Sequence, residues 1–169
     1  RRDLSMAQYM DVIDGKTASL VDACARCGAI LAGHTPEMVE SFGQLGSHFG
    51  IAFQIIDDLL DYGVGADDLG KAKFSDLGNG LTTLPLLLYM QNCSSEEKAT
   101  LEDLLSKASE PGVAPQIVQL LQSRNCFEQA KEMALERLAD AAEILSRLPE
   151  SKARDLLIGF FGAMAERSN

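Results

Sequence analysis

The decisive stretch of this sequence is Phe53-Gln54-Ile55-Ile56-Asp57-Asp58-Leu59-Leu60-Asp61. A helix turns by about 100° per residue, so that residues at i, i+3, i+4 and i+7 share one face. One amide and three carboxylates have this spacing: Gln54, Asp57, Asp58 and Asp61. Apolar side chains fill most of the remaining circumference. The stretch therefore predicts a largely buried helix that presents three carboxylates through one narrow arc.

Three carboxylates in one arc need a compensating charge. Like charges one turn apart repel each other, and an ionised carboxylate that is buried without a partner is costly. Mg²⁺ removes both problems, because it prefers oxygen ligands and binds through one or two carboxylates, waters and substrate phosphates. The pattern therefore predicts an Mg²⁺ site formed by Asp57, Asp58 and Asp61. Periodicity alone leaves open an alternative, an exposed acidic stripe paired with lysines.

Small residues continue the same stripe upstream, at Gly43, Ser47 and Gly50. They have two interpretations. Small side chains allow a neighbouring helix to approach closely, which is the reading favoured without other evidence. Alternatively, they line an elongated groove whose polar end holds an anion through a metal and whose other end accepts an apolar group.

Two basic elements flank the decisive stretch in the sequence. Lys16 and Thr17 place an ammonium and a hydroxyl among small neighbours in the preceding helix, and Gly70-Lys71 with Lys73 lies in the glycine-rich segment that follows. Lysine and hydroxyl groups are suitable contacts for phosphate. Either lysine alone is ordinary surface, whereas the combination indicates a diphosphate site beside the metal. The Gly-Lys-Thr triplet is not a P-loop, because the preceding glycine and the strand of that motif are absent.

The whole chain follows a helical pattern. Apolar residues recur at helical spacing nearly throughout, and no convincing period-two run is present. The sequence therefore predicts an all-α fold, with a long loop over residues 63–81. Helices are expected over residues 5–33 and 35–62, from 82 onward with Pro85 in the first turn, and over 150–166. Breaks are expected at 111–112 and 148–149, and capping boxes at Ser94-x-x-Glu97 and Asn125-x-x-Glu128.

Composition limits the class of protein. The chain of 169 residues has 25 acidic and 15 basic residues, a net charge of −10, which argues against a nucleic-acid partner. Hydrophobic residues make up 46% and charged residues 24%, the balance of a globular chain with one core. No stretch approaches the roughly 20 uninterrupted apolar residues that cross a bilayer, and no secretory leader is evident.

Four cysteines and two histidines are read as structural. Cys24 and Cys27 are expected to pack in the core, because no second CxxC pair accompanies them to complete a zinc site. His34 and His48 are isolated in the sequence. Thiols in a chain of this size favour a reducing compartment, so that a cytoplasmic location is expected and an organelle is left open.

Three motifs, in this order, resemble those of the trans-prenyltransferases, the chain-elongating polyprenyl diphosphate synthases. The motifs are Lys16-Thr17 with Tyr9 ahead of it; Gly50-x-x-Phe53-Gln54-x-x-Asp57-Asp58-x-x-Asp61, which resembles the second aspartate-rich motif; and Gly70-Lys71 followed by Asp76-Leu77 and Thr83-Leu84-Pro85. Each motif is weak alone, and the ordered set is specific. It covers about the first half of the chain.

The resemblance implies an all-α bundle of isoprenoid-synthase type and a site for two diphosphates. Asp57, Asp58 and Asp61 would ligate Mg²⁺, which bridges the diphosphate of an allylic substrate. The implied diphosphate contacts are Lys16, Thr17, Gln54 and Lys71, and the implied catalytic residues are Lys16, Asp57 and Asp58. In the implied reaction the allylic diphosphate ionises, the double bond of isopentenyl diphosphate attacks the carbocation, and a proton and diphosphate leave.

The sequence departs from the family pattern in two places. Leu81 stands where family members often carry a lysine, although long-chain synthases also depart there. Asp57-Asp58-x-x-Asp61 is the only DDxxD in the chain, and only 15 residues precede Lys16, whereas the family's first aspartate-rich motif belongs upstream. We therefore expect residues 1–169 to be the C-terminal part of a single prenyl synthase domain, inactive without its N-terminal half, and to form a homodimer or heteromer.

Two other functions stay open. The chain could be a non-catalytic helical subunit of a heteromeric prenyl synthase, which would keep its function when Asp57 and Asp58 are both replaced by alanine. It could also belong to another all-α class such as the terpene cyclases, which a cyclised product would reveal. Product length is not predicted, because the family sets it near the first aspartate-rich motif.

Overall fold

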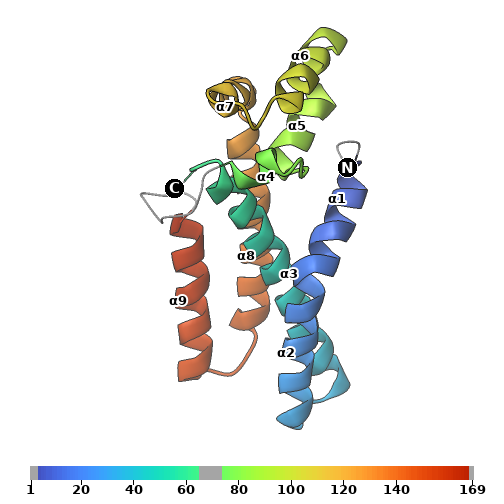
Figure 1. The fold of residues 1–169 in the computed structure, drawn as a ribbon. Helices are drawn as coiled ribbons and strands as arrows, with labels where there is room; N and C mark the ends of the chain where they lie inside the picture. Colours follow the sequence, from blue (N-terminus) through green and yellow to red (C-terminus); the bar gives the residue numbers. More distant parts are fainter. Residues whose placement is uncertain (1–3, 65–73, 168–169) are drawn as a thin grey trace.

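The computed structural model describes residues 4–64 and 74–167, and in these ranges the chain is helical without any strand (Figure 1). The predicted all-α class is thus confirmed. In chain order the elements are α1 (Met6–Ile13), η1 (Asp14–Ala18), α2 (Ser19–Leu31), α3 (Pro36–Asp61), α4 (Ser75–Gly78), α5 (Leu84–Asn92), α6 (Ser95–Ser106), α7 (Val113–Ser123), α8 (Cys126–Ser146) and α9 (Lys152–Arg167). No helix in the described ranges combines the length and apolarity needed to cross a membrane.

The expected helix over residues 5–33 is interrupted. Between α1 and α2 the backbone forms one π-helical segment, η1, which contains Lys16 and Thr17, and the rod ends at Leu31. Single π turns inside helices occur often at functional sites. The helical periodicity of the sequence gave no sign of η1, because a π-helical segment shifts the helical register by only one residue.

The capping predictions hold at two helices and fail at a third. Thr35 accepts a hydrogen bond from the backbone N–H of Met38, and Ser94 and Glu97 form a complete capping box at α6. The capping box predicted at Asn125 is wrong. The backbone of Asn125 is left-handed (φ 53°), and its side chain makes no capping hydrogen bond. Asparagine tolerates this conformation, and here it makes the tight turn from α7 into α8.

The long helix α3 lies at the centre and packs most extensively on α2 and α8. Its contacts with η1 and with α2 each depend on one glycine. A Cβ on Gly50 would lie 2.4 Å from Cα of Ala18, and one on Gly46 would lie 2.7 Å from the carbonyl oxygen of Val21. Of the predicted stripe, Gly50 thus allows close approach of two backbones, as the favoured interpretation holds, and Gly43 is covered by the side chain of Arg26. Ser47 instead lines a groove together with Asp22 and Arg26.

On its other side, α3 forms the core with α8. Ala52, Ile55 and Leu59 of α3 are completely buried. The facing stripe of α8 has the spacing of one helix face and consists of Ala130, Ala134, Leu138, Ala141 and Leu145. Burial of such an apolar stripe stabilises the fold by about 25 cal/mol per Å² of surface removed from water. This packing holds α3 rigidly and leaves its polar residues facing α1, α4 and α5.

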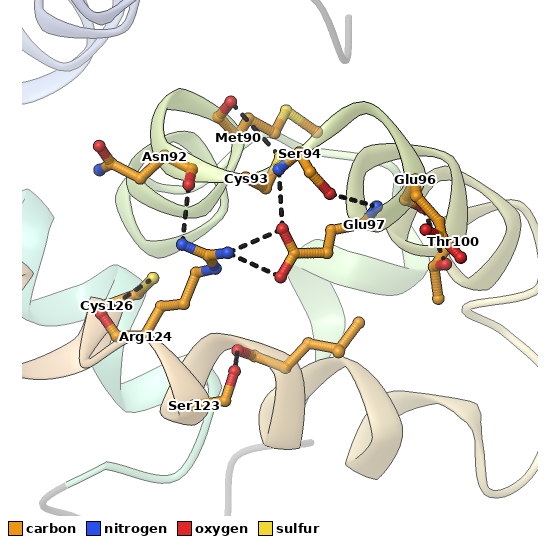
Figure 2. A network of polar contacts seen from close by, with 11 residues as sticks. Met90, Asn92, Cys93, Ser94, Glu96, Glu97, Thr100, Ser123, Arg124 and Cys126 are labelled. Atoms are coloured by element: carbon orange, nitrogen blue, oxygen red, sulfur yellow. Dashed lines mark hydrogen bonds and ion pairs between the residues drawn. The ribbon is translucent and has the colours of Figure 1, made fainter.

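Arg124 joins three helices at the upper end of the molecule (Figure 2). Its guanidinium donates to the carbonyl oxygen of Asn92 at 2.7 Å and to both carboxylate oxygens of Glu97 at 2.6 and 2.7 Å. The guanidinium also lies 5.6 Å from the ring centroid of Tyr89. These contacts tie the end of α7 to the end of α5 and the start of α6.

The core position expected for the two paired cysteines is wrong. Cys24 and Cys27 are both exposed on α2, because the face of α2 that packs on α3 is the one that carries Val21 and Ala29. Apolar residues are exposed on α2 and α9, notably Leu31 (89% exposed) and Leu156 (65%). An apolar groove of about 490 Å³ lies between α2, α3 and α9, and Cys24 is one of the residues that line it.

Candidate functional site

A chain of buried hydrogen bonds connects the first and second predicted motifs. The hydroxyl of Thr17, in η1, donates to Oε1 of Gln54 at 3.1 Å. Nε2 of Gln54 donates to Oδ1 of Asp58 at 3.3 Å, one turn further along α3. Gln54 is only 3% exposed and Asp58 5%. The structure therefore brings together three of the predicted site residues, and close packing of η1 on α3 through Gly50 makes this contact possible.

Asp58 accepts two further hydrogen bonds on its other oxygen. The hydroxyl of Tyr9 donates to Oδ2 at 2.8 Å, and the backbone N–H of Leu84, at the start of α5, donates to the same atom at 3.2 Å. Burial raises the pKa of Asp58 to about 6, although its three hydrogen bonds oppose the shift. Burial, together with the neighbouring Asp58 carboxylate, raises the pKa of Tyr9. Asp58 therefore links α1, α3 and α5.

Asp61 has a different set of partners. Its two carboxylate oxygens accept hydrogen bonds from the backbone N–H groups of Ser75 and Asp76, each at 3.0 Å. It thereby holds the first turn of α4, a helix within the segment expected to be loop. Burial, the largest cause, and the carboxylates of Asp76 and Asp57 raise the pKa of Asp61, while these two backbone hydrogen bonds lower it. A cation beside Asp61 would relieve this repulsion.

Because α3 is one continuous α-helix through these positions, the three carboxylates share one arc as expected, but they meet different partners. Asp58 turns inward to α1 and α5, Asp61 faces α4, and Asp57 is half-buried on the side of α3 near Asp61. The difference arises because α3 is covered on several sides, so that neighbouring positions of the stripe meet different elements. Lys16 is exposed in η1, next to Thr17. Lys71, with Gly70 and Lys73, lies outside the described residues.

The oxygen donors on this part of α3 suit Mg²⁺. Within residues 4–64 and 74–167, no group of three or more His, Cys, Asp or Glu side chains is placed to hold a metal ion. Mg²⁺ does not require such a group, because it keeps several waters and takes oxygens from substrate phosphates beside one or two carboxylates. Asp57 and Asp61, one helical turn apart and both oxygen ligands, fit this pattern.

Sequence reasoning missed the roles of Tyr9 and of the backbone of Leu84. Tyr9 lies two turns before Thr17 on the same rod, a spacing that places both on one face and that could have pointed to it. Its partner could not be identified from spacing, since Asp58 is 49 residues away. Leu81, the position where family members often carry a lysine, is 50% exposed.

Comparisons with known proteins identify the family. The family model described as polyprenyl synthetase matches residues 1–121. The octaprenyl diphosphate synthase of Escherichia coli is 34% identical over 165 residues, which cover 98% of this chain and 51% of that protein. The chain thus spans about half the length of the curated relatives it matches.

Two solved structures show the same fold. A decaprenyl diphosphate synthase from Rhodobacter capsulatus superposes with a TM-score of 0.88 at 26% identity, covering all of this chain and 52% of that one. A polyprenyl synthase from Caulobacter crescentus, solved with calcium and isoprenyl diphosphate, gives a TM-score of 0.86 at 28% identity, again covering 100% of this chain and 51% of the other. The all-α isoprenoid-synthase fold that the motifs imply is confirmed, and the chain belongs to the polyprenyl synthetase family.

Proposed function

We propose that this chain supplies the second aspartate-rich half of a trans-prenyltransferase that condenses isopentenyl diphosphate with an allylic diphosphate. The observation that supports this most is the hydrogen-bonded connection of Thr17, Gln54 and Asp58, because it joins two of the three motifs into one site. The relatives are prenyl diphosphate synthases by name, and one was solved with calcium and isoprenyl diphosphate. Divalent metal and diphosphate are therefore the ligands we assign to this site.

In the proposed site, Asp57 and Asp61 hold Mg²⁺, and Lys16, Thr17, Gln54 and Lys71 contact the diphosphate or its metals. When bound, Mg²⁺ would stabilise the negative charge that develops on the leaving diphosphate. The ammonium of Lys16 adds charge stabilisation on the side of η1. Metal ligation by Asp58 stays a prediction, and its buried position leads us below to a different role for this residue.

The reaction that we propose breaks the C–O bond of the allylic diphosphate and forms a C–C bond to isopentenyl diphosphate, with loss of a proton. We propose that it needs the half of the domain that the relatives have and this chain does not span. The apolar groove between α2, α3 and α9 supports this, because exposed apolar surface of this kind marks a site of contact with a partner or an apolar ligand. Dimer formation and a cytoplasmic location stay predictions.

The first test is binding. Calorimetric titration of the chain with pyrophosphate should show binding that requires Mg²⁺ and is weakened at least about tenfold by Asp57→Asn, since one carboxylate ligand is removed. Asp103→Asn is the matched control, because Asp103 is an exposed carboxylate on α6 that pairs with Lys107. Equal binding with and without Mg²⁺ would contradict the metal site.

The second test is activity. The chain should turn over isopentenyl and allylic diphosphates only after mixing with the N-terminal half of a prenyl synthase, with a linear polyprenyl product identified by chromatography. Turnover by the chain alone would refute the proposed need for the second half. Activity of the mixture that survives combined replacement of Asp57 and Asp58 by alanine would favour a non-catalytic subunit.

A further inference from the structure

The hydrogen bonds that connect Thr17, Gln54 and Asp58 run in one direction, from donor to acceptor. This direction follows from which groups carry protons. A hydroxyl has one proton and two lone pairs, and a side-chain amide has an NH₂ group on one side and an oxygen on the other. Asp58 accepts on Oδ2 from Tyr9 and from the N–H of Leu84, and on Oδ1 from Gln54. The carboxylate is thus the common acceptor of three donors.

This arrangement determines which way the amide of Gln54 points. Its NH₂ group faces Asp58, so that its oxygen must face Thr17. Thr17 therefore uses its only hydroxyl proton on Gln54, at 3.1 Å. The remaining lone pairs of the Thr17 oxygen are the part of the hydroxyl that a ligand can meet.

We propose that Tyr9 and Asp58 are positioning residues that fix the amide of Gln54 and, through it, orient the hydroxyl of Thr17 so that it presents lone pairs to the bound ligand. This inference rests on the proposed function, because it assigns roles within the same diphosphate site. Thr17 then faces the cationic part of the ligand, Mg²⁺ or one of its waters, and does not donate to a phosphate oxygen. Asp58 serves the site through Gln54 and not as a metal ligand.

A matched pair of variants separates this role from general stability. Tyr9→Phe removes the hydroxyl that holds Asp58, whereas Tyr62→Phe removes another buried hydroxyl, which bonds the side chain of Thr83 at 2.7 Å. Both tyrosines are at most 5% exposed, so that both changes remove one buried hydrogen bond. Only Tyr9→Phe removes a hydrogen bond to Asp58, which is connected through Gln54 to Thr17.

The binding experiment uses the full chain, pyrophosphate and Mg²⁺. Tyr9→Phe should weaken binding about tenfold, as is typical when a residue that orients a ligand group is lost, and Tyr62→Phe should stay within about twofold of the unmodified chain. Unchanged binding in Tyr9→Phe overturns the proposal. An equal loss in both variants also overturns it, because general destabilisation then explains the effect.

The direction of the Thr17 hydroxyl has its own test. Thr17→Val should weaken pyrophosphate binding more at saturating Mg²⁺ than at low Mg²⁺, and Thr17→Ser should restore it, because serine keeps the oxygen. An equal loss at both Mg²⁺ concentrations would mean that the hydroxyl donates to phosphate, which overturns the assigned orientation.

A measurement without ligand separates failure of this inference from failure of the proposed function. In ¹H–¹⁵N spectra, the side-chain NH₂ signals of Gln54 should move in Tyr9→Phe and in Asp58→Asn and stay in place in Tyr62→Phe. If the unmodified chain does not bind Mg²⁺ and pyrophosphate, the proposed function fails. The positioning role of Tyr9 and Asp58 is then tested by the Gln54 NH₂ signals alone. Gln54 signals that do not move in Tyr9→Phe overturn it.

Discussion

Replacing Gly50 by alanine tests how closely η1 and α3 must approach. The new Cβ would lie 2.4 Å from Cα and 2.9 Å from Cβ of Ala18, whereas carbon atoms in contact are normally about 3.5–4.0 Å apart. The obstacle is backbone on a helix held by its own hydrogen bonds, so that the two helices have to separate by about 1 Å at this point. Ala18 follows Thr17 directly, and the separation would therefore also lengthen the Thr17–Gln54 hydrogen bond.

Two opposing contributions give the magnitude. Overpacking of this kind costs about 3 kcal/mol, the upper part of the usual range, because no flexible side chain can give way. Alanine is favoured over glycine in a helix interior by about 1 kcal/mol. The free energy of unfolding should thus fall by about 2 kcal/mol, equivalent to a Tm about 4–8 °C lower in a domain of this size.

Thermal and urea unfolding followed by circular dichroism would measure this change. The matched control is Gly28→Ala on the facing helix α2, where a Cβ would meet nothing within 4 Å. There the helix preference acts alone, so that Tm should rise by about 2 °C. If Gly50→Ala were as stable as the unmodified chain, or more stable as in the control, the close approach of η1 and α3 would be refuted.

Two further predictions concern charge and thiol exposure. Arg124, and after it the capping contacts at Ser94, lower the pKa of Glu97 to about 2 from its ordinary 4.5. The stability due to this group is therefore present above pH 4.5 and is lost as the pH falls towards 2, so that the Tm difference between the unmodified chain and Glu97→Gln should shrink over this window. Cys24 and Cys27 should react with a thiol reagent in the folded chain, and Cys126 only after unfolding. Cys126 is 1% exposed, and burial raises its pKa to about 11. Mass spectrometry of a labelling time course would contradict this prediction if Cys126 reacted first.

Local sequence signals predicted the helices well. The N-caps of α3 and α6 hold because Thr35 and Ser94 act on backbone groups only three residues away. Failures occurred where a distant segment decides. Asn125 has the spacing of a capping box, yet the turn between α7 and α8 places its backbone in the left-handed region, from which its side chain makes no cap.

The candidate site shows the same division. Helical spacing correctly predicted Gln54 and Asp58 as neighbours on α3. The family resemblance linked these two residues to the Lys16-Thr17 motif. Helical spacing could not separate the roles of the aspartates, because that depends on which element covers each one. Asp58 meets Tyr9 and Leu84, and Asp61 meets the first turn of α4.

The amino-acid sequence by itself determined the all-α class, the family and the set of polar residues on α3, because helical periodicity and ordered motifs are properties of positions close together in the chain. Only the tertiary structure decided that Thr17, Gln54, Asp58 and Tyr9 form one directed chain of hydrogen bonds. The reason is physical: a hydrogen bond needs its two atoms within about 3 Å. Residues 49 positions apart reach that distance only when the α1–η1–α2 rod packs closely on α3, which the glycines of α3 allow.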